Sequence, residues 1–220
     1  MNGQERKIEM KKLNVGMTLL AVAVCALFSL TPLKAYADPV TLTYEYPGGQ
    51  SSGPDYVYPY YFSVNGSAAT PMMCLNFNLD IYQGERWTAT IAQVLGNTNF
   101  EEAAYIFSQA SAPGASSDQI AVAQWSNWVL FDAAASSSVP TNYQGDVTTL
   151  LDTAAAYVVA NPSASLYSNY VVYEPNSWTS SGEPQFLMGD APTPEPGSLF
   201  LLGTGMLGLA AFRLRKRRIA

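Results

Sequence analysis

Residues 116–134 read SSDQIAVAQWSNWVLFDAA, and their pattern predicts an α-helix that runs to about Ala135. Ser117 or Asp118 can cap its first turn. Spacings of four, four and three place four residues on one helical face: Ile120, Gln124, Trp128 and Phe131. Since all but the glutamine are large and apolar, this face is expected to pack into a core with an amide in its middle.

Two more helices are predicted beside this one in the sequence. The first covers residues 98–110 and is ended by Ala112-Pro113-Gly114. The second begins near Asp146 and stops at Asn161-Pro162. These helices form one group in the middle of the chain.

Strand patterns lie on both sides of the helical group. Period-two alternation, β-branched and aromatic residues predict strands over 40–46, 56–64, 72–82, 87–94, 167–173 and 185–188. Pro59 favours an edge position, and Asn65-Gly66 predicts a hairpin turn. The expected fold is therefore α+β: an antiparallel β-sheet or partial barrel with a grouped helical subdomain, flanked by an N-terminal signal helix and a C-terminal hydrophobic helix.

Gln124 is the polar residue on the apolar helix face, and an unpaired amide there costs about 1–3 kcal/mol. One interpretation is an amide that bonds to the backbone of a neighbouring loop. The other pairs it with Cys74, because a thiol and a glutamine amide can condense to an internal thioester with loss of ammonia. Cys74 is the only cysteine left after the N-terminal segment is removed. A buried free thiol and an intermolecular disulfide are the alternatives for it.

The residues Ala123-Gln124-Trp125-Ser126-Asn127-Trp128 resemble the Thr-Gln-x-Ala-Ile-Trp pattern of bacterial thioester domains. Gln124 and Trp128 match that pattern outright. Three positions depart from it, namely Ala123, Ser126 and Asn127. In those adhesins a cysteine on an earlier strand pairs with the glutamine, and Cys74 lies on a predicted strand. The resemblance therefore implies a candidate thioester site of Cys74 and Gln124.

The N-terminus has the three parts of a secretion signal. Lys7, Lys11 and Lys12 precede an apolar run from Val15 to Leu30, and Ala35-Tyr36-Ala37 is the pattern that signal peptidase accepts. We expect residues 1–37 to be a signal peptide that is cleaved after Ala37. A retained membrane anchor is the alternative.

The C-terminus reads DAPTPEPGSLFLLGTGMLGLAAFRLRKRRIA from Asp190. Its order is a Pro-rich linker over 191–198 that contains Pro194-Glu195-Pro196, then an apolar run, then a cluster of arginine and lysine. The apolar run has about 15 residues, fewer than the roughly 20 that span a bilayer comfortably. The basic cluster is expected to stay in the cytoplasm, which leaves residues 38–190 outside as an extracellular domain.

This order closely resembles the PEP-CTERM sorting signal, in which the membrane protease exosortase is thought to cut near the Pro-Glu-Pro motif. The resemblance implies a Gram-negative bacterium, a transient anchor in the inner membrane through a helix at 199–220, and then a place at the cell surface or outside the cell. Pro194, Glu195 and Pro196 would be recognised by exosortase and are not catalytic here. An ordinary tail anchor is the alternative.

Charge and composition exclude several functions. Between Asp38 and Glu195 there are 15 acidic residues and one basic residue, Arg86, so the net charge is −14. Such a surface repels nucleic acid. That segment has no histidine and no lysine, which excludes histidine-based catalysis, histidine-bound zinc, lysine Schiff bases and Lys–Asn isopeptide crosslinks. No cofactor or metal is expected.

Three further groupings carry weaker signals. Asn78, Asp80 and Glu85 could bind a cation, although solvated carboxylates are the simpler interpretation. Glu101 and Glu102 suit the first turn of a helix rather than an acid pair. The abundant tyrosines could stack on sugars, but packing in a sheet explains them as well.

The expected function is that of an exported cell-surface or extracellular-matrix protein, processed through its sorting signal and not an enzyme. A hydrolase with two carboxylates is the least favoured class, because no pair of acids stands out. The expected partners are signal peptidase, exosortase, the inner membrane and a polysaccharide or surface protein. The alternative function is a covalent adhesin with an internal Cys74–Gln124 thioester.

Overall fold

A computed structural model describes residues 39–179, 182–192, 203 and 205. The chain divides into two units, Met1–Asp38 and Pro39–Ala220. The predicted signal peptide with Ala35 and Ala37 lies outside the described residues. So do Pro194, Glu195 and Pro196, and all of the predicted C-terminal helix except Gly203 and Gly205. Among the described residues, no helix combines the length and the apolar character that a membrane span requires.

Six antiparallel strands close into a barrel in the order β1-β4-β5-β8-β7-β6. Closure pairs every strand on both sides, so this sheet has no free edge. A separate small hairpin, β2 and β3, lies in the connection between β1 and β4. The strand bounds are β1 Val40–Pro47, β2 Ser51–Ser52, β3 Asp55–Tyr56, β4 Tyr60–Val64, β5 Thr70–Cys74, β6 Arg86–Gln93, β7 Tyr170–Pro175 and β8 Leu187–Asp190.

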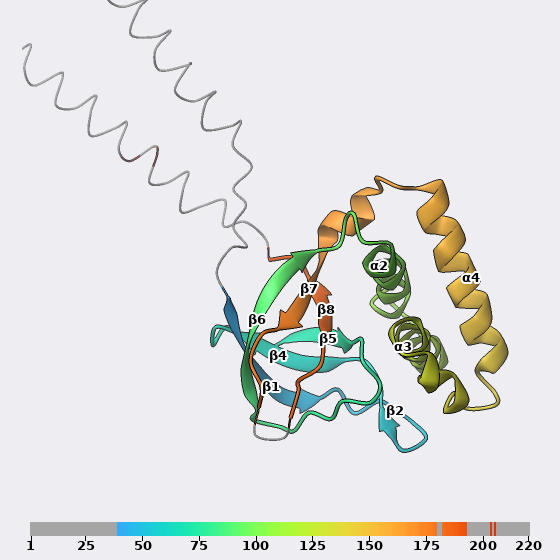
Figure 1. Ribbon diagram of the computed structural model, residues 1–220, viewed down its shortest axis with the longest axis horizontal. Coiled ribbons are helices and arrows are strands. Elements are labelled where there is room, and N and C mark those ends of the chain that lie inside the picture. Colours follow the sequence, from blue (N-terminus) through green and yellow to red (C-terminus); the bar gives the residue numbers. More distant parts are fainter. Residues whose placement is uncertain (1–38, 180–181, 193–202, 204, 206–220) are drawn as a thin grey trace, which may run out of the picture. The chain divides into compact units, whose positions relative to one another are not determined.

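Three helices lie together on one side of the barrel (Figure 1). They are α2 Thr98–Ala110, α3 Ser117–Phe131 and α4 Gln144–Ala160, with short 3-10 turns η1 Ala133–Ser137 and η2 Ser165–Asn169. Asn97 caps α2 through a bond to the amide of Phe100. Ser116 and Gln119 form a reciprocal capping box at the start of α3. The predicted grouping of the helices is therefore present, and the partial barrel is a closed one.

Side-chain alternation gives the domain two packed layers. Strand β5 shows the division most clearly, because successive side chains point to opposite faces of a sheet. Met73 packs with the apolar residues of the helices. Met72 and Cys74, on the other face of β5, are equally buried but do not belong to that cluster. The side chain of Cys74 thus faces the barrel interior at the end of the strand, on the opposite face of β5 from the helices.

Two strand predictions were too long. The strand predicted over 56–64 is divided at Pro59, which cannot donate to a ladder, into β3 and β4. The strand predicted over 72–82 stops at Cys74. After that residue Leu75 donates to the carbonyl of Phe186 at 2.9 Å, and the side chain of Asn76 accepts from the amide of Phe186 at 2.7 Å. Residues 75–85 then form the loop that connects β5 to β6.

Candidate functional site

The side chain of Gln124 on α3 reaches the end of β5. Its Nε2 donates to the carbonyl oxygen of Cys74 at 2.7 Å, and its Oε1 accepts from the backbone amide of Tyr58 at 3.2 Å. Gln124 and Cys74 are both 0% exposed. The structure therefore brings together the two residues of the candidate thioester site, and it also pairs the glutamine with backbone groups, as the first interpretation of Gln124 expects.

The local packing of α3 fixes this position. Asn127, one turn on from Gln124, donates from Nδ2 to the sulfur of Met73 at 2.7 Å. Trp125 donates from Nε1 to the hydroxyl of Ser52 at 3.0 Å. These bonds tie the helix to β5 and to β2, so the amide of Gln124 has little freedom to leave the end of the strand.

Cys74 is a fully buried residue. It is the last residue of β5 and lies opposite Leu187 of β8. Burial raises the pKa of its thiol well above the ordinary value. A free thiol here would stay neutral and unreactive toward reagents in solution. The complete burial also argues against the intermolecular disulfide, because a second chain cannot reach the sulfur while the domain is folded.

Two tyrosines lie near the thiol of Cys74. Burial raises the pKa of Tyr44 on β1 and of Tyr60 on β4, and the nearby Cys74 raises both further. Tyr60 donates its hydroxyl to the carbonyl of Tyr56. The phenols therefore form part of the barrel interior that surrounds Cys74.

The other groupings from the sequence have structural partners of their own. Asn78 donates to the carboxylate of Asp132, and Glu85 accepts from the amide of Tyr82 at 2.8 Å. Glu101 accepts from the amide of Gly96 at 2.8 Å ahead of α2. Within the part of the chain that the structure describes, no group of three His, Cys, Asp or Glu side chains could hold a metal.

The sequence did not reveal Tyr58 as a member of the site. Its contribution is a backbone amide, which every residue except proline carries, so no side-chain pattern marks it. Asn127 is, in the sequence, only a departure from the thioester pattern. The sequence does contain an indication of its role, because a side-chain amide at a buried helix position needs a hydrogen-bond partner. In the structure Nδ2 of Asn127 has that partner in the sulfur of Met73.

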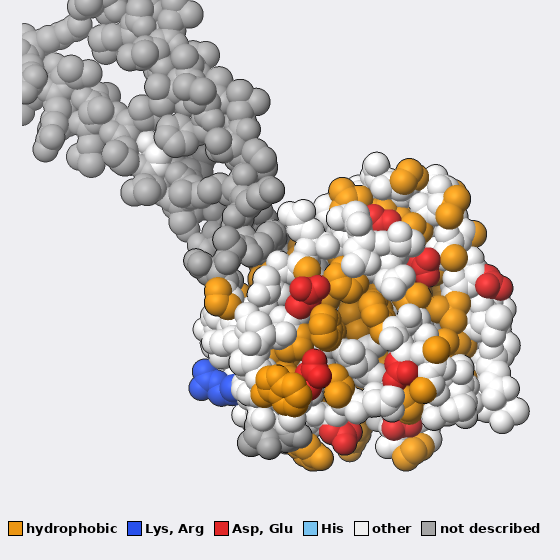
Figure 2. All heavy atoms as spheres, viewed as in Figure 1, with side chains coloured by type: hydrophobic (Ala, Val, Ile, Leu, Met, Phe, Trp, Pro, Cys, Tyr) orange, Lys and Arg blue, Asp and Glu red, His pale blue; other side chains and the backbone are white. Residues whose placement is uncertain are grey.

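Carboxylates are spread over the face of the domain that Figure 2 shows, with a basic group at one side. Burial raises the pKa of Glu102 and Asp190, and burial together with the nearby Asp80 raises the pKa of Asp55. No lysine or histidine between residues 39 and 192 offsets this charge. The acidic surface therefore affects how stability depends on pH.

We expect the domain to be more stable at about pH 4.5 than at about pH 7.5. Asp55, Glu102 and Asp190 have raised pKa values in the folded state, so the folded chain binds more protons than the unfolded chain between the ordinary and the raised values. The contribution of these three groups to the free energy of unfolding is present below that pH window and is lost as pH rises through it. Thermal unfolding followed by circular dichroism measures the effect, and Asp55→Asn should reduce it. A lower midpoint in acid would contradict the expectation.

Comparison with known proteins supports the assignment of the C-terminal tail. A family model of the PEP-CTERM protein-sorting motif matches residues 192–218. Pro194, Glu195 and Pro196 lie within the matched residues. The chain carries this motif, which marks an exported protein that exosortase processes for membrane-associated sorting to the cell surface. No curated protein matches the sequence.

The solved structures that are similar to the chain include two domains from Streptococcus pyogenes. One is the N-terminal domain of the Streptococcus pyogenes pilus tip adhesin Cpa, with 13% identity and a TM-score of 0.41. The other is the N-terminal thioester domain of fibronectin-binding protein SfbI from Streptococcus pyogenes, with 11% identity and a TM-score of 0.42. Each comparison covers 74% of this chain and 97% of the other.

Proposed function

We propose that the exported domain is a covalent surface adhesin whose reactive group is an internal thioester between Cys74 and Gln124. The observation that carries the proposal is the fully buried amide of Gln124, held at 2.7 Å from the carbonyl of Cys74. The nitrogen in that bond is the atom that leaves as ammonia when the thioester forms. The domain would react once with its target and would not turn over as an enzyme.

The bond changes are balanced without a further reactant. The sulfur of Cys74 attacks Cδ of Gln124, the C–N bond breaks, and the thiol proton leaves with the amide nitrogen as ammonia. Negative charge develops on Oε1 during the attack. The amide of Tyr58, 3.2 Å from Oε1, is placed to stabilise that charge and then to bond the thioester carbonyl.

Burial supports the lifetime of such a group. The neighbours Leu75 and Ala123 are 0% exposed, and Trp125 is 1% exposed. Water that cannot reach the thioester cannot hydrolyse it. Since Gln124 is 0% exposed, reaction with a target requires a local opening that exposes its carbonyl. An amine or a hydroxyl on the target surface would then be acylated by the Gln124 carbonyl, and the thiol of Cys74 would be released. The protein would then be joined to that target by an amide or an ester bond.

The intact mass of residues 38–192, with and without methylamine, tests the proposal. We expect a mass lower than the sequence mass by one ammonia, and addition of one methylamine at Gln124 with release of a titratable thiol. Cys74→Ala should have its full sequence mass and take up no methylamine. A full sequence mass for the unsubstituted chain, with a thiol that titrates only after unfolding, would overturn the thioester.

A passive surface protein is the second candidate, and one observation favours it. Both polar atoms of the Gln124 amide have backbone partners, which is what an unreacted core glutamine needs. In that case the domain would be displayed through the sorting motif and would bind without a covalent bond. Cys74→Ala separates the two candidates, because a passive protein keeps its binding and a covalent adhesin loses its permanent attachment.

A further inference from the structure

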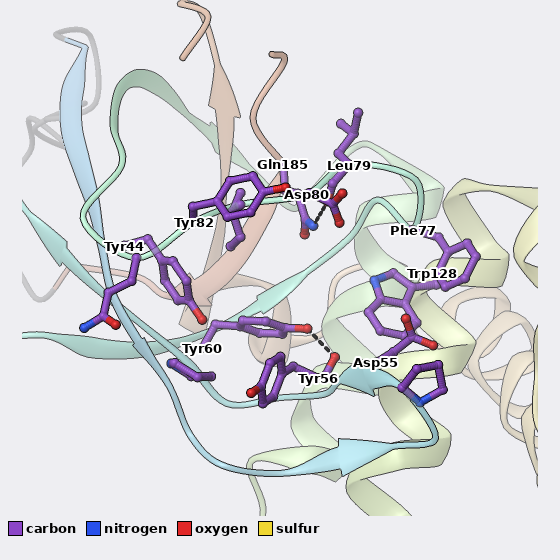
Figure 3. Close-up of a pocket in the computed structure, with 14 residues that line it drawn as sticks. Tyr44, Asp55, Tyr56, Tyr60, Phe77, Leu79, Asp80, Tyr82, Trp128 and Gln185 are labelled. Atoms are coloured by element: carbon purple, nitrogen blue, oxygen red, sulfur yellow. Dashed lines mark hydrogen bonds between the residues drawn. The ribbon is translucent and has the colours of Figure 1, made fainter. Parts of the chain in front are cut away.

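A cavity of about 330 Å³ opens where the end of the barrel meets α3 (Figure 3). Its size is that of a site for a small ligand, for which roughly 300–1,000 Å³ is typical. The wall is formed by β1, β3, β4, the loop of residues 75–85, α3 and the segment ahead of β8. The thioester chemistry proposed above uses none of the side chains that line it.

Six of the fourteen residues that line the cavity are aromatic. Tyr44 and Tyr60 are buried at its base, whereas Tyr56 and Tyr82 are 54% and 58% exposed at its rim. Large apolar rings that are left open to water represent a cost that a bound ligand removes. Flat rings with a polar tip suit a ligand that has both apolar faces and polar edges.

Two buried polar atoms in the wall have no partner within the described residues. They are Nε1 of Trp128 and Oε1 of Gln185, on side chains that are only 4% and 7% exposed. In Figure 3 the indole nitrogen of Trp128 points toward the middle of the ring of side chains. The amide nitrogen of Gln185 is already engaged with the carbonyl of Leu79, which holds the side chain in place. Buried polar groups are normally paired, so both atoms point to a ligand.

The donor and acceptor pattern selects the class of ligand. The indole Nε1 can only donate, whereas Oε1 of Gln185 can only accept. Asp55 and Asp80 add carboxylate acceptors at the rim. A cation would supply donors alone and would leave Trp128 unpaired, and the two carboxylates would repel an anion. A neutral molecule with several hydroxyl groups can pair with the indole donor, the amide oxygen and both carboxylates, because a hydroxyl both donates and accepts.

We propose that this cavity binds a neutral saccharide, with ring faces against the tyrosines and hydroxyls on Trp128, Gln185 and the two aspartates. The binding is non-covalent and goes beyond the proposed thioester. It would select a sugar-coated surface before any covalent step. Because Cys74 does not line the cavity, the two functions can be tested apart.

The test uses the full-length chain in detergent, labelled with nitrogen-15, and neutral hexaoses of glucose, galactose and mannose. The chain has four tryptophans, so the indole N–H signals can be assigned by substitution. We expect a hexaose to shift the indole signal of Trp128 and to leave that of the exposed Trp178 unchanged. Cys74→Ala should bind with the same affinity, which separates this proposal from the thioester.

Substitutions locate the bound sugar. Gln185→Leu and Trp128→Phe should each weaken binding by about tenfold, the effect expected from loss of one buried hydrogen bond. Asp80→Asn lies at an exposed position, so the fold should persist while affinity falls. Trp178→Phe is the matched control and should bind normally. The proposal is overturned if no hexaose shifts Trp128, if Asp80→Asn and Gln185→Leu bind unchanged, or if methylammonium binds as well as the sugar.

Discussion

Glutamate in place of Gln124 is expected to remove about 3–5 kcal/mol from the free energy of unfolding at neutral pH. The substitution keeps the shape of the side chain and exchanges one atom. The Nε2 donor becomes an oxygen that faces the carbonyl oxygen of Cys74. Because position 124 is 0% exposed, a charged carboxylate there would have neither water nor a cation beside it. The group must therefore take up a proton to stay in the folded domain.

The pH dependence follows from this requirement. The carboxyl group that Gln124→Glu introduces should have a folded-state pKa above the ordinary value of about 4.3, so the lost stability returns in acid and disappears again as pH rises. Urea unfolding at about pH 4.5 and about pH 7.5 measures the loss in the free energy of unfolding. The measurement is made in a Cys74→Ala background, which removes any thioester. Gln109→Glu, at an exposed position on α2, is the matched control and should change little. An equal loss from both substitutions would contradict the expectation.

Trp125→Ala is expected to cost about 3–5 kcal/mol. The indole is 1% exposed, contacts the rings of Phe77 and Trp128, and donates to Ser52 at 3.0 Å. Its loss would leave a cavity beneath α3 and would detach the helix from the hairpin of β2 and β3. Denaturant unfolding followed by circular dichroism measures the change.

The control for that substitution lies in the same chain. Trp178 is 75% exposed, so Trp178→Ala removes an equal number of atoms from a place where they bury little surface. We expect it to change stability by less than about 0.5 kcal/mol. If the two substitutions cost the same, the packing of α3 around Trp125 does not contribute to stability as the structure indicates.

The helices could be predicted from the sequence because their signals are local. The cap expected for α3 at Ser117 or Asp118 falls one or two residues after the observed cap, Ser116, and Pro113-Gly114 separates α2 from α3. The predicted bounds therefore came within a few residues except at the end of α3. The structure ends α3 at Phe131 and continues as the turn η1, where the side chain of Asp132 accepts from the amide of Ala134. A local competitor for the backbone thus shortened the helix.

Barrel closure could not be predicted in the same way. It depends on the pairing of β5 with β8, which places Cys74 opposite Leu187. These two residues are separated in the sequence by more than half of the domain. Period-two alternation identifies a strand but says nothing about its neighbour. The candidate site was found only in part for the same reason. The resemblance named Cys74 and Gln124, whereas Tyr58 and the cavity wall arise from segments that meet only in the folded chain.

The pairing of β5 with β8 has a mechanical consequence. Cys74 is the last residue of β5, and Asp190 is the last residue of β8, the point at which the chain leaves the barrel. Because the two strands are antiparallel, these residues lie at opposite ends of their shared ladder. A target would be joined to Gln124 on α3, which contacts β5 at the carbonyl of Cys74. The part of a load that passes from α3 into β5 and out through the departing tail would pull the two strands lengthwise past each other. All of the ladder hydrogen bonds would then resist together, rather than opening one after another.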